Sequence, residues 1–144
     1  GLIDIPYTQE RWCAAGGGST TFNGREARTR ACTELAAARI YTTSPDAFAP
    51  ADWLRYDALS RRTALRRFGG DSYCYGLLAS GHADLVVEAG LQPYDYLALV
   101  PVIEGAGGVI TDWQGEPLGV DSDGRVVAAA TAQLHAEALA ALGA

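Results

Sequence analysis

Hydrophobic and polar positions alternate at the start of the chain. Leu2–Tyr7 switches between apolar and polar residues, and Arg11–Ala15 continues this pattern after a short polar turn, as half-buried strands do. Asn23-Gly24 is a strong hairpin signal, because both residues tolerate a positive φ. We therefore predict antiparallel hairpins in residues 1–30. Since two or three strands alone are marginal in water, we expect them to need a larger sheet, with nothing in this chain to cover them.

After residue 36 the pattern changes to alternating strands and helices. The predicted strands are Ala37–Thr42, Ala64–Phe68, Leu85–Glu88, Val109–Asp112 and Val126–Ala130, and the predicted helices are Ala51–Arg62, Asp71–Ser80, Tyr94–Ala106 and Ala132–Leu142. Asp71 is the expected cap of its helix, and Pro101 predicts a kink near Leu97. This order predicts a layered α/β sandwich with a mixed sheet in residues 31–144, preceded by hairpin strands of another sheet in residues 1–30.

Composition narrows the possible partners. The chain of 144 residues carries a net charge of −6, and its eleven basic residues are all arginines without a basic stripe, which argues against nucleic acid. No apolar run approaches the ~20 residues of a membrane span, so we expect a cytoplasmic protein that does not bind membranes. Cys13, Cys32 and Cys74 are widely spaced, which predicts buried free thiols instead of a disulfide framework or a zinc site.

Carboxylates mark the most informative stretch of the chain. Glu88 closes a predicted strand and Asp95 opens the next predicted helix. Ligands of open α/β sheets bind at the carboxyl ends of the strands, which is where both side chains are expected. From residue chemistry alone, Asp95 is either a helix N-cap, the more common role, or a metal ligand. The same two kinds of role, cap or site residue, stay open for Asp71.

The segment around Asp95 resembles a known signature. Tyr94-Asp95, followed by Ala98 and then by Glu104–Gly108, is similar to the second signature of the inositol monophosphatase superfamily, in which Trp-Asp precedes small residues and a helix that ends in Gly-Gly. The resemblance implies that Asp95 binds a catalytic Mg²⁺ and contacts the substrate. It also implies that Glu88 accepts hydrogen bonds from substrate hydroxyls.

A second segment resembles the part of the family that lines the substrate pocket. The run from Arg66 to Tyr73 is similar to the family's Arg-x-x-Gly segment, which makes Arg66, Arg67 and Gly70 candidate substrate-binding residues. Because Arg66 and Arg67 are adjacent on a predicted strand, their side chains point to opposite faces, and we favour Arg67 for the pocket.

Asp71 separates two branches of this superfamily. Gly-Gly-Asp-x-Tyr around Asp71, and the sequence from Asp84 to Asp95, resemble the histidinol-phosphatase branch. A carboxylate at this position suits a substrate that carries an ammonium or imidazolium group.

The family's remaining metal ligands come from an upstream Glu and an Asp-Pro-x-Asp-Gly-Thr signature, and neither occurs in this sequence. The resemblance therefore implies the C-terminal half of a Mg²⁺-dependent phosphomonoesterase of the histidinol-phosphatase type, inactive alone. Its expected partners are a small phosphate ester and the missing half or a second copy, with a homodimer as the complete enzyme. The alternatives are an inositol monophosphatase-type enzyme and a non-catalytic remnant or subunit of the fold.

Overall fold

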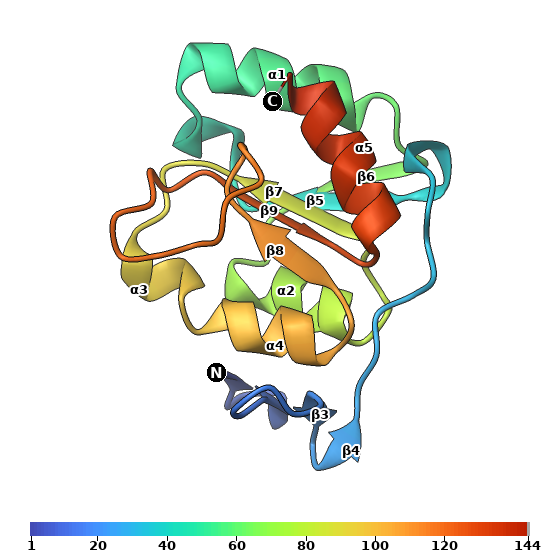
Figure 1. Ribbon diagram of the computed structural model, residues 1–144, viewed down its shortest axis with the longest axis vertical. Coiled ribbons are helices and arrows are strands. Elements are labelled where there is room, and N and C mark those ends of the chain that lie inside the picture. The colour runs from blue at the N-terminus through green and yellow to red at the C-terminus, as the bar shows by residue number, and fades with distance from the viewer. Residues whose placement is uncertain (144) are drawn as a thin grey trace.

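The computed structural model describes residues 1–143 and contains two β-sheets (Figure 1). The first is antiparallel, with the strand order β1 (Leu2–Ile5), β2 (Glu10–Cys13), β3 (Thr21–Phe22) and β4 (Arg25–Glu26). The second has the order β6 (Leu65–Phe68), β5 (Arg39–Thr42), β7 (Leu85–Glu88), β9 (Val126–Ala129) and β8 (Val109–Thr111). In the second sheet β6, β5 and β7 run parallel, and β9 is antiparallel to both of its neighbours. The prediction of a mixed sheet preceded by hairpins is confirmed.

Helices cover both faces of the five-stranded sheet. The helices are α1 (Pro50–Ser60), α2 (Ser72–Ala79), α3 (Pro93–Tyr96), α4 (Leu99–Gly105) and α5 (Ala132–Leu142), with short 3-10 turns at Leu35–Ala37 and Pro45–Ala47. Figure 1 shows α1 and α5 on one face of the sheet, α2 and α4 on the other, and the hairpin sheet beyond α2 and α4. The molecule is therefore layered, as the alternation of strands and helices predicts.

Alternate residues of the central strands supply two separate hydrophobic cores. Leu85 and Val87 of β7 pack towards α1 and α5, whereas Val86, between them, packs towards α2 and α4. Val126–Ala129 alternates in the same way. Because successive side chains of a strand point to opposite faces, a strand covered on both sides is apolar along its covered length, as Leu85–Val87 and Val126–Ala129 are.

The hairpin sheet is covered by this chain, so the expectation that nothing covers it was wrong. Ile3 and Trp12 are buried in the same core as α2 and α4. Trp12 donates a hydrogen bond from Nε1 to Ser80 Oγ at 2.7 Å. Gly76 lies against its indole ring, where an added Cβ would come within 2.9 Å. The absence of a side chain at Gly76 thus allows the indole ring of Trp12 to pack directly on α2, which holds the hairpin sheet against this helix.

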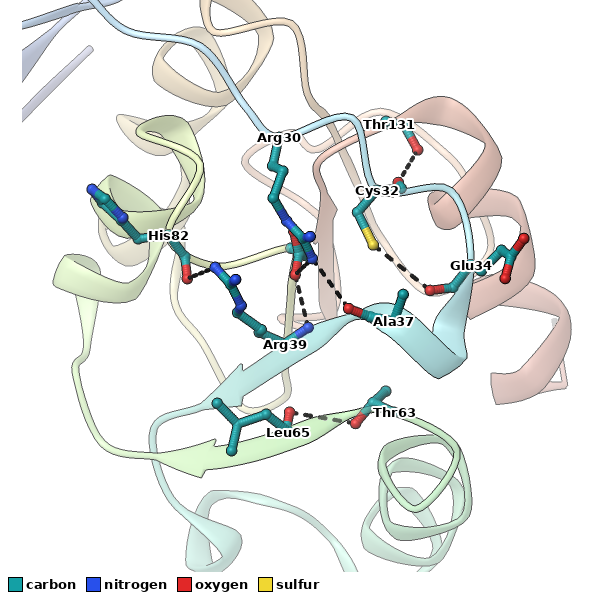
Figure 2. A network of polar contacts seen from close by, with 10 residues as sticks. Arg30, Cys32, Glu34, Ala37, Arg39, Thr63, Leu65, His82 and Thr131 are labelled. Atoms are coloured by element: carbon teal, nitrogen blue, oxygen red, sulfur yellow. Dashed lines mark hydrogen bonds and ion pairs between the residues drawn. The ribbon is translucent and has the colours of Figure 1, made fainter.

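An ion pair ties the linker between the two sheets to the larger one. Arg30 donates from Nε and Nη2 to the carboxylate of Asp84, at 2.8 and 2.6 Å. The backbone N–H of Arg39 donates to the same carboxylate at 2.8 Å. Figure 2 shows that Arg30 also reaches the carbonyl of Ala37. These contacts satisfy Asp84, which has no exposed surface and would otherwise be a costly buried charge.

The kink predicted from Pro101 is confirmed, whereas the predicted burial of all three cysteines is not. The predicted helix Tyr94–Ala106 is divided into α3 and α4, and the break at Leu97-Ala98 agrees with the expected effect of Pro101, whose ring conflicts with the carbonyl of Leu97. The prediction of three buried thiols was wrong for Cys13, which is exposed, while Cys32 and Cys74 are buried and free. Within residues 1–143, no helix is both long and apolar enough to cross a membrane.

Candidate functional site

A cavity of about 410 Å³ opens at the carboxyl ends of β5 and β7. Asp71, Glu88 and Asp95 line it, together with uncharged residues from the ends of both strands and from α2 and α3. No arginine or histidine is among the lining residues in the part of the chain that the structure describes. The three carboxylates thus line one cavity at the edge of the sheet where open α/β folds bind ligands.

Glu88 is a buried carboxylate whose partners are all neutral donors. Its side chain lies at the end of β7 and the residue is only 4% exposed. Oε1 accepts hydrogen bonds from the backbone N–H of Thr43, at 3.0 Å, and from the Thr43 hydroxyl. Oε2 accepts one from the Tyr75 hydroxyl at 2.8 Å. Glu88 thus lines the cavity with a carboxylate that three neutral donors hold in place.

Tyr75 is held as a permanent donor. It lies on α2 and is buried, and this burial, with the charge of Glu88 beside it, raises the pKa of its hydroxyl well above the usual value. The hydroxyl therefore keeps its proton and donates a hydrogen bond to Glu88.

Asp95 combines a structural role with an unused oxygen. It is the third residue of α3, and its Oδ2 accepts the N–H of Gln92 at 2.8 Å in a capping box. The structure thus corrects the N-cap alternative, because Gln92 occupies that position. Within residues 1–143 the other oxygen has no hydrogen bond to the protein, and Asp95 is exposed. A free carboxylate oxygen at a cavity fits Mg²⁺, which takes one or two carboxylates plus water and substrate phosphate.

The described residues contain no larger group of candidate metal ligands. Residues 1–143 contain no group of three or more His, Cys, Asp or Glu side chains that could hold a metal ion. Asp95 could therefore supply only one ligand, and a metal ion would need further protein ligands from outside these residues.

Asp71 is in an unusual backbone conformation. It has φ 44° and ψ −133°, and it follows Gly69 and Gly70, which also have positive φ. Its side chain makes no capping hydrogen bond to α2, so the predicted cap was wrong even though the residue occupies the N-cap position. The physical reason is the backbone, since caps usually adopt an extended conformation. The carboxylate is left free at the cavity wall.

The remaining candidates lie outside the lining of the cavity. Arg66 donates from Nη1 to Asp57 at 2.6 Å and to Ser60 at 3.1 Å, which holds its side chain against α1. Arg67 and Gly70 are both exposed. The structure therefore places Asp71, Glu88 and Asp95 in the lining of one cavity, and Arg66, Arg67 and Gly70 outside that lining.

Sequence reasoning missed Thr43 and Tyr75. Thr43 directly follows β5, at the same sheet edge as Glu88. Tyr75 lies four residues after Asp71, so both positions fall on one face of the helix that the sequence predicts over Asp71–Ser80. That spacing was the available signal, but a tyrosine in an apolar helix is more often a core residue.

Comparison with known proteins gives consistent matches over the whole chain. The sequence model of the inositol monophosphatase family matches residues 1–144. A chloroplastic bifunctional phosphatase from Arabidopsis thaliana is 46% identical over 99% of this chain and 43% of its own length. A histidinol-phosphatase from Chlorobaculum parvum is 33% identical over 89% of this chain and 50% of its own length.

The fold matches solved structures equally well. An inositol monophosphatase from Zymomonas mobilis superposes with a TM-score of 0.97 at 44% identity, and the match covers 99% of this chain and 56% of that one. The chain thus spans about half the length of the relatives that it matches.

Proposed function

The chain belongs to the inositol monophosphatase family, and from this premise we propose that it is the C-terminal half of a magnesium-dependent phosphomonoesterase acting on histidinol phosphate. The observation that carries the proposal is the charge of the cavity, where three carboxylates meet without a basic side chain among the described lining residues. One relative carries the name histidinol-phosphatase, which supports the substrate class, and another is named a bifunctional phosphatase, which supports the type of reaction.

The two ends of such a substrate need different partners in this cavity. The phosphate is an anion, and carboxylates alone would repel it. The unused oxygen of Asp95 would hold Mg²⁺, which neutralises phosphate charge and activates water when bound. Asp71 and Glu88 would face the other end of the substrate, where an ammonium or imidazolium group forms charge-assisted hydrogen bonds with carboxylates.

An inositol phosphate is the second candidate. Glu88 can accept a hydrogen bond from a substrate hydroxyl as readily as from an N–H group, and the structural match to the Zymomonas mobilis enzyme supports this alternative. The two substrates differ in charge, so Asp71 is the residue that distinguishes them. A neutral polyol forms no ion pair with a free carboxylate at the wall, whereas a cationic substrate does.

The proposal is tested by replacing Asp95 with Asn in the complete phosphatase, that is, this chain together with the N-terminal half of the enzyme. The Asn carbonyl can still accept the N–H of Gln92, so the capping box should survive while the charge is lost. We expect phosphate release from histidinol phosphate with Mg²⁺ to fall by more than about 100-fold, beyond the usual effect of a supporting residue.

Asp112→Asn is the matched control. Asp112 also accepts backbone N–H groups, from Gln114 and Glu116, but it does not line the cavity. Its replacement should leave turnover unchanged. Mg²⁺-dependent turnover by the 144-residue chain alone, lost in Asp95→Asn, would contradict the assignment as a half-enzyme.

A further inference from the structure

The hydrogen bonds around Glu88 leave little freedom in how it can bind a ligand. A carboxylate has about four acceptor positions, two on each oxygen. Both positions on Oε1 are taken by Thr43, through its N–H and its hydroxyl. One position on Oε2 is taken by Tyr75. A single acceptor position on Oε2 therefore remains for a group in the cavity.

The donors to Glu88 are themselves fixed. Tyr75 is 1% exposed and its ring is part of the core between the sheet and α2. Thr43 follows β5, whose residues pair with β6 and β7 on either side. Because both donors come from rigid elements, the carboxylate cannot turn without leaving at least one buried donor unsatisfied.

We propose that Tyr75 and Thr43 are positioning residues that clamp Glu88, so that it offers one acceptor on Oε2 to a single N–H or O–H donor of the substrate. This inference rests on the proposed phosphatase function. It adds that the choice between substrates depends on the neutral donors Thr43 and Tyr75, which hold the Glu88 carboxylate from behind. The hydroxyl of Tyr75 matters most, because it shares Oε2 with the substrate.

The test is a double-mutant cycle in the complete phosphatase. In Tyr75→Phe the ring stays and only the donor is removed. Since Glu88 contacts a non-reacting part of the substrate, we expect KM for histidinol phosphate to rise roughly 10- to 100-fold while kcat changes by less than about twofold. In a Glu88→Ala background, the same Tyr75→Phe change should add less than about twofold, because its effect passes through Glu88.

Two controls separate positioning from a general loss of structure. Tyr56 is equally buried, and its hydroxyl has no hydrogen-bond partner within the described residues, so Tyr56→Phe removes the same atom from a site without the clamp. It should leave KM unchanged. Thr43→Ser keeps the hydroxyl and should retain the wild-type KM, whereas Thr43→Val should raise it.

A Tyr75→Phe enzyme with unchanged KM would overturn the clamp, as would an equal rise of KM in the presence and absence of Glu88. Crystal structures of the wild type and Tyr75→Phe give a readout that does not depend on activity. We expect Glu88 Oε2 to move by about 1 Å or more, and an unmoved carboxylate would also overturn the clamp. A wild-type enzyme without activity on any phosphate monoester would instead overturn the proposed function.

Discussion

At the scale of single residues, Asp71 has a positive φ, a backbone conformation that residues other than glycine rarely adopt. Non-glycine residues at positive φ are strained, typically by 1–3 kcal/mol, and such strain is often found at functional sites. Asp71 has φ 44°, and its side chain gives no capping bond in return. The residue therefore contributes little to the fold, and its carboxylate at the cavity is the remaining reason for its presence.

Two substitutions at this position separate strain from charge. Asp71→Gly should raise the free energy of unfolding by about 1 kcal/mol, because relief of strain exceeds the entropy that glycine adds to the unfolded chain. Asp71→Asn should change it by less than about 0.5 kcal/mol, since Asn also tolerates positive φ. Urea denaturation measures both values.

Both variants should lose activity on a cationic substrate. In the complete phosphatase we expect kcat/KM for histidinol phosphate to fall roughly 10- to 150-fold, the value of a lost charge-assisted hydrogen bond. Activity on inositol phosphate should stay unchanged. Equal losses on both substrates would remove the argument for a cationic substrate.

At the scale of elements, local pattern predicted most helices and strands but not their side-chain partners. The apolar stretch of β7 and the alternation in β1 were readable, because burial on one or two faces determines the sequence of a strand. The bond between Arg66 and Asp57 joins β6 to α1, and no local pattern specifies such a pair. The positive φ of Asp71 was equally hidden, since a cap position and a strained turn share the same residue types.

Gly76 is the element-scale feature with the clearest consequence. Alanine usually stabilises a helix interior relative to glycine by about 1 kcal/mol. Here the added methyl group would meet the ring of Trp12 at 2.9 Å, so we expect Gly76→Ala to lower the free energy of unfolding by about 1–3 kcal/mol. Gly119 has no neighbouring atom within 4 Å of an added Cβ, and Gly119→Ala is the control that should be nearly neutral. A Gly76→Ala variant that is more stable than the wild type would show that Trp12 does not pack tightly on α2.

At the scale of the whole molecule, the hairpin sheet has one face covered by α2 and α4 and, among the described residues, an unpaired edge at β1. β1 pairs with β2, and within residues 1–143 no strand lies on its other side. Unpaired edges tend to recruit further strands. We therefore expect the amides of Leu2–Ile5 that point away from β2 to exchange rapidly with solvent in the isolated chain, and to become protected once the N-terminal half is added.

Hydrogen exchange followed by mass spectrometry or NMR measures this change. The central strand β7, paired on both sides in this chain, is the internal control and should be protected in both samples. If the outward-pointing amides of Leu2–Ile5 are strongly protected in a proven monomer of the 144-residue chain, the prediction that β1 pairs with a strand from the N-terminal half is contradicted.

The five-stranded sheet separates the two hydrophobic cores, and each core contains one fully buried tryptophan, Trp12 or Trp113. Trp12 is buried on the side of the hairpin sheet, where it stacks on Phe22 with 4.7 Å between ring centroids, whereas Trp113 is buried on the side of α1 and α5. Indole emission depends on the immediate surroundings of each ring. A variant that retains only Trp12 therefore reports by fluorescence on the seating of the hairpin sheet, and one that retains only Trp113 reports on the opposite layer of the same molecule.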